Sequence, residues 1–228
     1  MLGGGDRVWG TGRPAQRLLG ELGARPDRLA NLPYFIELDH YRSGPRTAEG
    51  PVQLGSASQL VDRKDLKTAL RALASLHDRG ISNWRYRIVG TGPAEEGLRQ
   101  EAAALGIADR VELVGWLEGD ALVEFFATCD VFVHPCEFEP WGVVIMEAMA
   151  SGAAIVASDR TYCALDWVEP EVSGLIHRTW DADDLAKKLE WILADRGRIG
   201  RMGEAAREVV RRWPVSRGVE EIEARAGA

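Results

Sequence analysis

The stretch that decides the fold runs from Asp130 to Asp159 and is DVFVHPCEFEPWGVVIMEAMASGAAIVASD. A short apolar run, DVFVH, is followed by a loop, by an apolar segment with helical spacing, and by a second apolar run, AAIVA. Apolar runs of this length are typical of buried strands in a parallel sheet. The stretch therefore predicts strand, loop, helix and strand, the repeating unit of α/β domains.

The same alternation extends in both directions from that unit. Strands are expected at 52–60, 84–90, 110–114, 130–134, 153–157 and 173–177. Helices are expected at 64–79, 94–105, 119–128, 142–151 and 182–194. This order predicts a doubly wound, Rossmann-like parallel sheet with helices on both faces, whose ligand binds at the carboxyl ends of the strands.

The two ends of the chain do not fit that domain. A helix over 13–24 and the extended run ANLPYFIEL are too few elements to bury a core of their own, so this part packs on the main domain or belongs to something larger. At the other end, a basic amphipathic helix over 197–212 is followed by Trp213-Pro214 and a short helix at 216–225.

The composition excludes several classes of protein. With 228 residues, 46% of them hydrophobic, the chain can bury a core, and its net charge of −7 disfavours nucleic-acid binding. No apolar run is long enough for a membrane span and no signal peptide is recognisable, so we expect a cytoplasmic protein, with peripheral attachment to a membrane left open. The cysteines (Cys129, Cys136 and Cys163) lack the spacing of a disulfide framework or a zinc site and are expected to be reduced thiols.

The loop and helix after the 130–134 strand carry the chemistry. Pro140 suits the opening turn of a helix, and the amides of Trp141, Gly142 and Val143 would then form an anion site at its start. Glu147 lies within VVIMEAMA, where a carboxylate is costly unless it has a partner. That partner is either a ribose hydroxyl, as in dinucleotide folds, or a structural ion pair or cap.

These residues resemble a known family. The pattern P-x3-E-P-x-G-x4-E-A-M-A-x-G from Pro135 to Gly152 is similar to the E-x7-E signature of retaining GT-B glycosyltransferases in the glycosyl transferases group 1 family. SQLVDRK at 58–64 is similar to the family's G-R-L-x-x-x-K segment, GTGP at 90–93 to its GxGP turn, and 111–115 to its VxFxG strand. The resemblance implies the C-terminal, donor-binding half of a GT-B architecture.

The resemblance assigns roles by position. Glu147 would bind the ribose hydroxyls of a nucleotide and Glu139 would contact the transferred sugar. Lys64 would neutralise the diphosphate leaving group, while the Gly142 and Val143 amides would bind phosphate or sugar oxygens. Negative charge develops on a departing diphosphate, so a fixed ammonium and helix-start amides would stabilise the transition state. No metal or cofactor is implied.

Other positions would complete or alter the donor site. Trp116 and Leu117 would flank the nucleobase. Gln59 stands where the family usually has an arginine, and it can donate hydrogen bonds but cannot neutralise charge, a loss for which Arg63 would compensate. Cys136 replaces a usual serine and RTYCA at 160–164 replaces a glycine-rich turn, so an altered sugar pocket is expected.

The predicted function is transfer of a sugar from a nucleotide diphosphate sugar, with retention of configuration, to a saccharide, lipid-linked or small-molecule acceptor. The expected domains are 1–50, a remnant of an acceptor domain plus a linker, 51–212, the donor-binding domain, and 213–228, a helix crossing back to the first domain. Because most of that first domain is missing, the alternative is a sugar-nucleotide-binding module that needs a separate N-terminal domain.

Two weaker signals remain. Gly90-Thr91-Gly92, with Glu112 downstream, partly matches a dinucleotide fingerprint and leaves a nicotinamide-dependent oxidoreductase as a third hypothesis. His134, at a strand end, is either a packed residue or a sugar contact. The histidines show no metal-ligand spacing.

Overall fold

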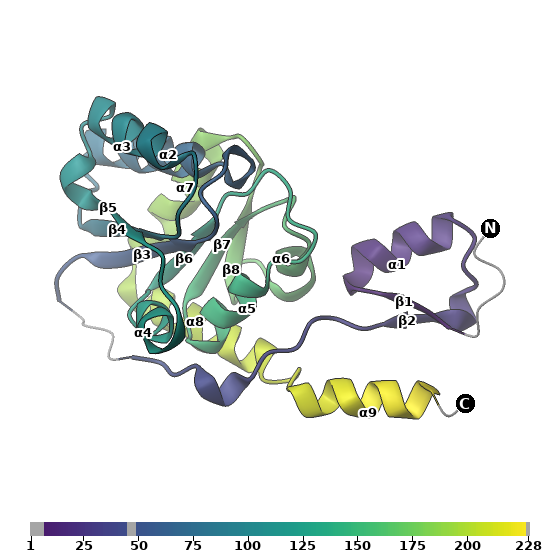
Figure 1. Cartoon of the computed structure of the whole chain (residues 1–228). Coiled ribbons are helices and arrows are strands. Elements are labelled where there is room, and N and C mark those ends of the chain that lie inside the picture. The colour runs from purple at the N-terminus through teal and green to yellow at the C-terminus, as the bar shows by residue number, and fades with distance from the viewer. Residues whose placement is uncertain (1–6, 45–48, 227–228) are drawn as a thin grey trace.

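The computed structural model describes residues 7–44 and 49–226, and a six-stranded parallel sheet forms its centre (Figure 1). Its strands are β3 (Val52–Ala57), β4 (Trp84–Val89), β5 (Val111–Gly115), β6 (Val131–His134), β7 (Ala154–Ser158) and β8 (Gly174–His177). They lie in the order β5-β4-β3-β6-β7-β8, with every neighbouring pair parallel. The predicted α/β class and all six predicted strands are confirmed, although β3 ends three residues before the expected boundary at 60.

Helices cover both faces of this sheet. They are α2 (Leu66–Asp78), α3 (Glu95–Ala104), α4 (Gly119–Ala127), α5 (Val143–Ala150), α6 (Tyr162–Trp167), α7 (Ala182–Leu193) and α8 (Arg196–Val210). The short α6 was not predicted, and the predicted helix at 64–79 begins only at Leu66, because the residues Asp62–Lys64 form a 3-10 turn and Asp65 has a left-handed backbone.

The core divides into two clusters, one on each face of the sheet. Leu54, Val133 and Val156 face a cluster that includes the apolar sides of α2 and α7. Phe132 and Ile155, one position away along their strands, face a second cluster with α4 and α5. Successive side chains of a strand point to opposite faces, so a strand covered on both sides must be apolar throughout. This explains the unbroken apolar runs in the sequence.

The strand order creates a crevice between β3 and β6. From β3 the chain continues outward through β4 to β5, whereas from β6 it continues through β7 to β8 on the other side. The loops that follow β3 and β6 therefore leave the sheet in opposite directions, and open α/β sheets bind their ligands between such loops.

The N-terminal residues form a small βαβ unit beside α6 (Figure 1). Strand β1 (Val8–Gly10) pairs in parallel with β2 (Leu29–Asn31), and α1 (Gly12–Glu21) connects them. Strand β1 was not predicted, β2 overlaps only the first two residues of the expected extended run ANLPYFIEL, and α1 ends before the expected 24. The unit is held to the main domain by Arg13, whose Nε lies 2.8 Å from Oδ1 of Asp166.

An extended segment leads from β2 back to the sheet and passes the C-terminal helix α9 (Val215–Ala226) (Figure 1). Ile36 forms a parallel β-bridge with Pro214, and the Phe35 and Trp213 rings lie 6.4 Å apart. All three cysteines are buried free thiols, as expected. Among the residues that the structure describes, no helix combines the length and apolar character needed to cross a bilayer.

Candidate functional site

The loop between β6 and α5 differs from its predicted form at one point. Pro140 was expected in the opening turn of the helix, but α5 starts three residues later, at Val143. Gly142, with φ of 90°, has a left-handed backbone that interrupts any helical path from Pro140. A Cβ on this glycine would lie 3.0 Å from Cγ of Glu139. The glycine therefore places Glu139 beside the helix start, where the first amides of α5 have no acceptor within the helix.

A charged cluster, defined as Arg63, Lys64, His134 and Glu139, occupies the crevice between β3 and β6. Nζ of Lys64 donates to Oε2 of Glu139 at 2.5 Å, and only 10% of the lysine side chain and 14% of the glutamate side chain are exposed. Arg63 Nη1 lies 3.7 Å from the same oxygen. Because the loops after β3 and β6 are far apart in sequence, the strand order alone brings this lysine and this carboxylate together.

The backbone of Glu139 is fixed by the neighbouring loop between β7 and α6. Its amide donates to the carbonyl oxygen of Arg160 at 3.0 Å, and its carbonyl accepts from the amide of Tyr162 at 3.0 Å. Glu139 also forms a parallel bridge with Thr161. The stretch 160–164, which replaces the glycine-rich turn of the resembled family, thus supports the loop that carries Glu139.

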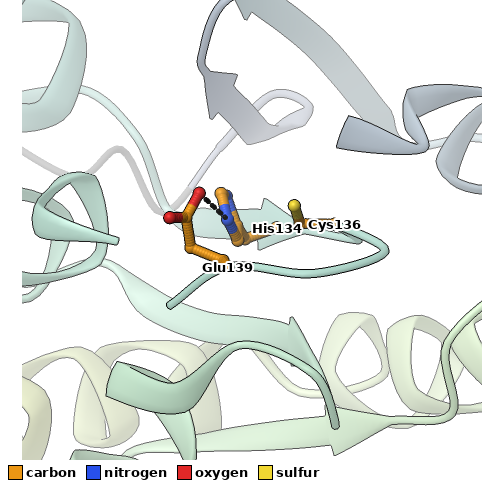
Figure 2. A group of neighbouring side chains, drawn as sticks. All are labelled: His134, Cys136 and Glu139. Atoms are coloured by element: carbon orange, nitrogen blue, oxygen red, sulfur yellow. Dashed lines mark ion pairs between the residues drawn. The ribbon is translucent and has the colours of Figure 1, made fainter. Parts of the chain in front are cut away.

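His134 faces Glu139 but is neutral. Its Nε2 lies 3.9 Å from Oε2 of Glu139 (Figure 2). Burial, followed by repulsion from Lys64, lowers the pKa of His134 to about 3. Its Nε2 is buried and makes no hydrogen bond to the described part of the chain. A neutral ring with a free nitrogen beside the crevice can bind a hydroxyl group, so both interpretations of His134 stay open.

Three potential metal ligands meet at this point, although the histidine spacing gave no such indication. Ligand atoms of His134, Cys136 and Glu139 lie within 4.8 Å of one another (Figure 2). The Cys136 thiol donates to the carbonyl oxygens of Arg63 and Phe138, both at 3.2 Å. Burial raises the pKa of this thiol, which opposes the thiolate that a metal needs. The Lys64 ammonium bound to the same carboxylate also repels a cation.

A cavity of about 280 Å³ is lined in part by Gln59, in the loop after β3 that also leads to Lys64, and by Val144, in the first turn of α5. We call it the donor cavity. Gln59 and Glu147 contribute polar groups to it, and Trp116 and Leu117 contribute apolar surface. Its remaining lining residues are Ala57, Ser58, Val89, Gly90, Glu118, Gly119, Leu122, Phe126 and Val144. Trp116 is 66% exposed, so it forms an open wall of the cavity.

Glu147 has the partner that its apolar surroundings demanded. The hydroxyl of Tyr41, from the segment between β2 and β3, donates to Oε1 of Glu147 at 2.6 Å. Burial raises the pKa of Glu147, and the hydrogen bond from Tyr41 only partly opposes that rise. The partner is a phenol, not the ion pair or helix end of the structural alternative. Among the residues that the structure describes, no cation forms an ion pair with this carboxylate, which lies against the cavity.

The predicted site residues thus fall into two neighbouring groups. Lys64, Arg63 and Glu139 lie in the charged cluster, with Gly142 and Val143 next to them at the start of α5. The donor cavity holds the other predicted residues, which are Gln59, Trp116, Leu117 and Glu147. Arg63 contacts Glu139 and is not among the residues that line the cavity with Gln59, so its compensation for the arginine that Gln59 replaces stays a prediction. Tyr41 was not predicted.

The turn Gly90-Thr91-Gly92 serves packing. A Cβ on Gly90 would lie 1.8 Å from the carbonyl oxygen of Ser58, and one on Gly92 would lie 2.3 Å from that of Leu60. The amide of Leu60 donates to the carbonyl oxygen of Thr91 at 2.9 Å. Both glycines are therefore explained by the close approach of the loop after β3, which leaves the dinucleotide fingerprint without support.

The chain is similar in sequence to known proteins. The family model for glycosyl transferases group 1 matches residues 39–209. A GDP-mannose-dependent alpha-(1-6)-phosphatidylinositol monomannoside mannosyltransferase from Mycobacterium tuberculosis is 32% identical over 203 residues, which cover 81% of this chain and 52% of the relative. The chain spans about half the length of the curated relatives it matches.

Solved structures share the fold. Sucrose-phosphate synthase from Thermosynechococcus elongatus superposes with a TM-score of 0.82 at 25% identity, over 96% of this chain and 57% of the synthase. Anabaena HepE, solved in complex with UDP, superposes with a TM-score of 0.86 over 97% of this chain and 64% of HepE, at 21% identity. The α/β architecture predicted from the sequence is thus that of known glycosyltransferases.

Proposed function

The chain belongs to the glycosyl transferases group 1 family, and from that premise we propose that it binds a nucleotide diphosphate sugar and supports transfer of the sugar with retention of configuration. The observation that carries the proposal is the adjacency of two sites at one crevice. The donor cavity, with Glu147, suits a nucleoside, and the charged cluster, with Lys64 and Glu139, suits the diphosphate and the sugar.

The donor cavity has the features that a nucleoside requires. An exposed indole, Trp116, and Leu117 offer flat apolar surface to a base, while the carboxylate of Glu147 can accept from two adjacent ribose hydroxyls. Gln59 can donate to a phosphate or base oxygen. Complexes of HepE with UDP and with UDP-glucose show that a protein of this fold holds such ligands.

The charged cluster supplies the chemistry of the transfer step. The bond between the anomeric carbon and the phosphate oxygen breaks, its electron pair leaves with the diphosphate, and an acceptor hydroxyl bonds to that carbon as its proton is released. The Lys64 ammonium and the free amides at the start of α5 would stabilise the diphosphate charge. Glu139, held against Lys64, would contact the sugar. Retention is inferred from the E-x7-E spacing of Glu139 and Glu147.

We propose that residues 51–212 form the donor-binding domain and that 1–50 and 213–228 link it to an acceptor-binding domain. The βαβ unit at the N-terminus and the contact between Ile36 and Pro214 support this division, although 1–6, 45–48 and 227–228 lie outside the described residues. Because the chain spans about half of its relatives, a sugar-nucleotide-binding module that relies on a separate N-terminal domain is the second candidate. The acceptor is a saccharide, a lipid-linked molecule or a small molecule.

Isothermal titration calorimetry with UDP-, GDP- and ADP-sugars tests the proposal. We expect one donor to bind, and Glu147→Ala and Lys64→Ala each to weaken its binding by about 10-fold or more, since each removes a charge-assisted contact. Lys187→Ala, an exposed lysine on α7, is the matched control and should leave affinity unchanged. If no donor binds, or if both site variants bind like the parent, the site assignment is wrong.

Turnover separates the two candidates. Donor hydrolysis or sugar transfer by the chain alone would favour the enzyme, whereas binding without turnover would favour the module. Binding of NAD(P) in place of the sugar nucleotides would instead revive the oxidoreductase hypothesis.

A further inference from the structure

The carboxylate of Glu147 is held from outside the sheet domain. Its hydrogen-bond donor, Tyr41, precedes it by 106 residues and follows a 3-10 turn at Leu38–His40. This tyrosine is partly buried, and its ring meets the ring of Phe126 edge to face, with centroids 6.2 Å apart. Phe126 itself lines the donor cavity. Tyr41 therefore lies behind the cavity wall, in contact with two of its lining residues.

The segment that carries Tyr41 makes further contacts with α4, in addition to the ring contact with Phe126. The amide of Gly44 donates to the carbonyl oxygen of Ala127 at 3.1 Å, and Arg42 Nη2 lies 3.6 Å from Oε2 of Glu124. The approach at Gly44 is close, because an added Cβ would lie 2.6 Å from that carbonyl oxygen. These contacts follow the tyrosine in the chain, and the β-bridge between Ile36 and Pro214 precedes it. A segment fixed in this way can hold the Tyr41 hydroxyl in one place.

We propose that Tyr41 is a positioning residue for nucleotide binding, whose hydroxyl fixes one oxygen of Glu147 so that the other faces the ribose. The inference rests on the proposed function, since it assumes that Glu147 binds the nucleotide. A carboxylate has two oxygens, and one hydrogen bond to Oε1 leaves Oε2 and the remaining lone pairs for the ligand. Fixing the group before binding removes part of the entropy cost of ordering it in the complex.

The same hydrogen bond favours the ionised carboxylate. Burial and the adjacent Glu147 raise the pKa of Tyr41, so the phenol keeps its proton and remains a donor. Among the described residues, the other titratable groups around Glu147 are His40, on the same segment as Tyr41, and Glu118, which also lines the cavity and accepts from Trp116. Loss of the hydroxyl would therefore raise the pKa of Glu147 further, because burial would be less opposed.

Titration of UDP, GDP and ADP into the intact chain tests the proposal. The nucleotide that binds the parent most tightly is then used to compare the affinities of the variants. We expect Tyr41→Phe to weaken affinity at neutral pH by about 3- to 10-fold, the loss of one charge-assisted hydrogen bond. Tyr34→Phe makes the same chemical change on the same segment, away from Glu147, and should leave affinity unchanged. Gly44→Ala, which pushes the segment off α4, should reproduce the loss with Tyr41 intact.

Two further readouts distinguish positioning from a general structural effect. Affinity should fall on acidification as Glu147 gains its proton, and in Tyr41→Phe this fall should begin at higher pH than in the parent. In a Glu147→Gln background the tyrosine change should cost less than about 2-fold, because a neutral amide accepts a weaker hydrogen bond.

Three results would overturn the proposal. Equal affinity of parent and Tyr41→Phe at every pH would remove the role of the hydroxyl. A uniform loss at every pH that persists in the Glu147→Gln background would show that Tyr41 acts elsewhere. If none of the three nucleotides binds the parent, the proposed function itself fails and this inference fails with it. Circular dichroism measures whether each variant is folded. If Tyr41→Phe is not folded, the affinity of Gly44→Ala decides whether the position of Tyr41 matters for nucleotide binding.

Discussion

Of the two glutamates of the E-x7-E spacing, Glu139 lies in the loop before α5 and Glu147 lies within α5, and yet they have opposite surroundings. Glu139 lies among cations, with the ammonium of Lys64 at 2.5 Å and Arg63 at 3.7 Å from one carboxylate oxygen. Glu147 lies among apolar side chains of α5 and accepts a hydrogen bond from a neutral phenol. The first carboxylate is compensated in charge within the protein, and the second is not.

This difference indicates a division of work between the charged cluster and the donor cavity. A lysine already fixed against a carboxylate has its charge in place before diphosphate charge develops, which is the condition for transition-state stabilisation. An uncompensated, buried carboxylate gains most from a ligand that donates hydrogen bonds to it, which is a condition for ground-state binding. The charged cluster should therefore govern the chemical step in addition to its part in donor binding, whereas the cavity should govern donor affinity alone.

The largest expected effect is on turnover. Lys64→Ala and Glu139→Gln should each lower kcat by about 100-fold or more, the scale on which a fixed transition-state donor acts, whereas Glu147→Gln should mainly raise the donor KM. Steady-state donor hydrolysis or sugar transfer measures both constants. Lys187→Ala is again the control. If Glu147→Gln lowered kcat as far as Lys64→Ala at an unchanged KM, the division of work would be wrong.

A smaller effect, on stability, should have opposite signs at the two glutamates. Glu139→Gln leaves the Lys64 ammonium nearly buried without a counter-charge and should destabilise the fold by about 1–2 kcal/mol. Glu147→Gln removes a partly buried charge that forms no ion pair in the described part of the chain, and should raise Tm at pH 7 by about 2–4 °C, the effect of about 1 kcal/mol in a domain of this size. Thermal denaturation of both variants measures the two signs.

The pH dependence of the second effect follows from the raised pKa of Glu147. The folded state binds this proton more tightly than the unfolded state, so the carboxylate costs stability above its folded pKa, and the cost disappears below its unfolded value. The gain in Tm of Glu147→Gln should therefore shrink as the pH is lowered. A gain that stayed constant down to pH 4 would assign it to packing instead of charge.

The sheet and half of the site were predictable because their signals are local in sequence. Strands covered on both faces must be continuous apolar runs, so VFVH and AIVAS were recognised directly, and the strand order then placed Lys64 and Glu139 at one crevice. The elements that were missed are short. β1 has three residues and α6 has six, too few for a period to be recognised, and of the expected run ANLPYFIEL only the first two residues belong to the three-residue β2.

The partner of Glu147 shows where sequence reasoning ends. The position of Glu147 inside VVIMEAMA indicated that its carboxylate needs a partner. Nothing local in the sequence identified that partner as Tyr41, in the segment between β2 and β3. The meeting of His134, Cys136 and Glu139 was hidden for a similar reason, because the left-handed Gly142 and the bridge between Glu139 and Thr161 shape their loop. Contacts set by loop shape have no period in the sequence.

The smallest expected effect concerns metal removal, and it tests whether Lys64 and Arg63 supply the positive charge of the charged cluster without a metal ion. We expect the transfer or hydrolysis rate to be the same in EDTA as in Mg²⁺, Mn²⁺ or Zn²⁺. A cation held by His134, Cys136 and Glu139 would have to displace the Lys64 ammonium from Glu139 and deprotonate a buried thiol whose pKa is already raised. Loss of activity in EDTA that one metal restores would show that the cation, not the lysine, compensates Glu139. In that case Lys64→Ala should cost little in the presence of the metal, and the contrast between the two glutamates would have a different cause.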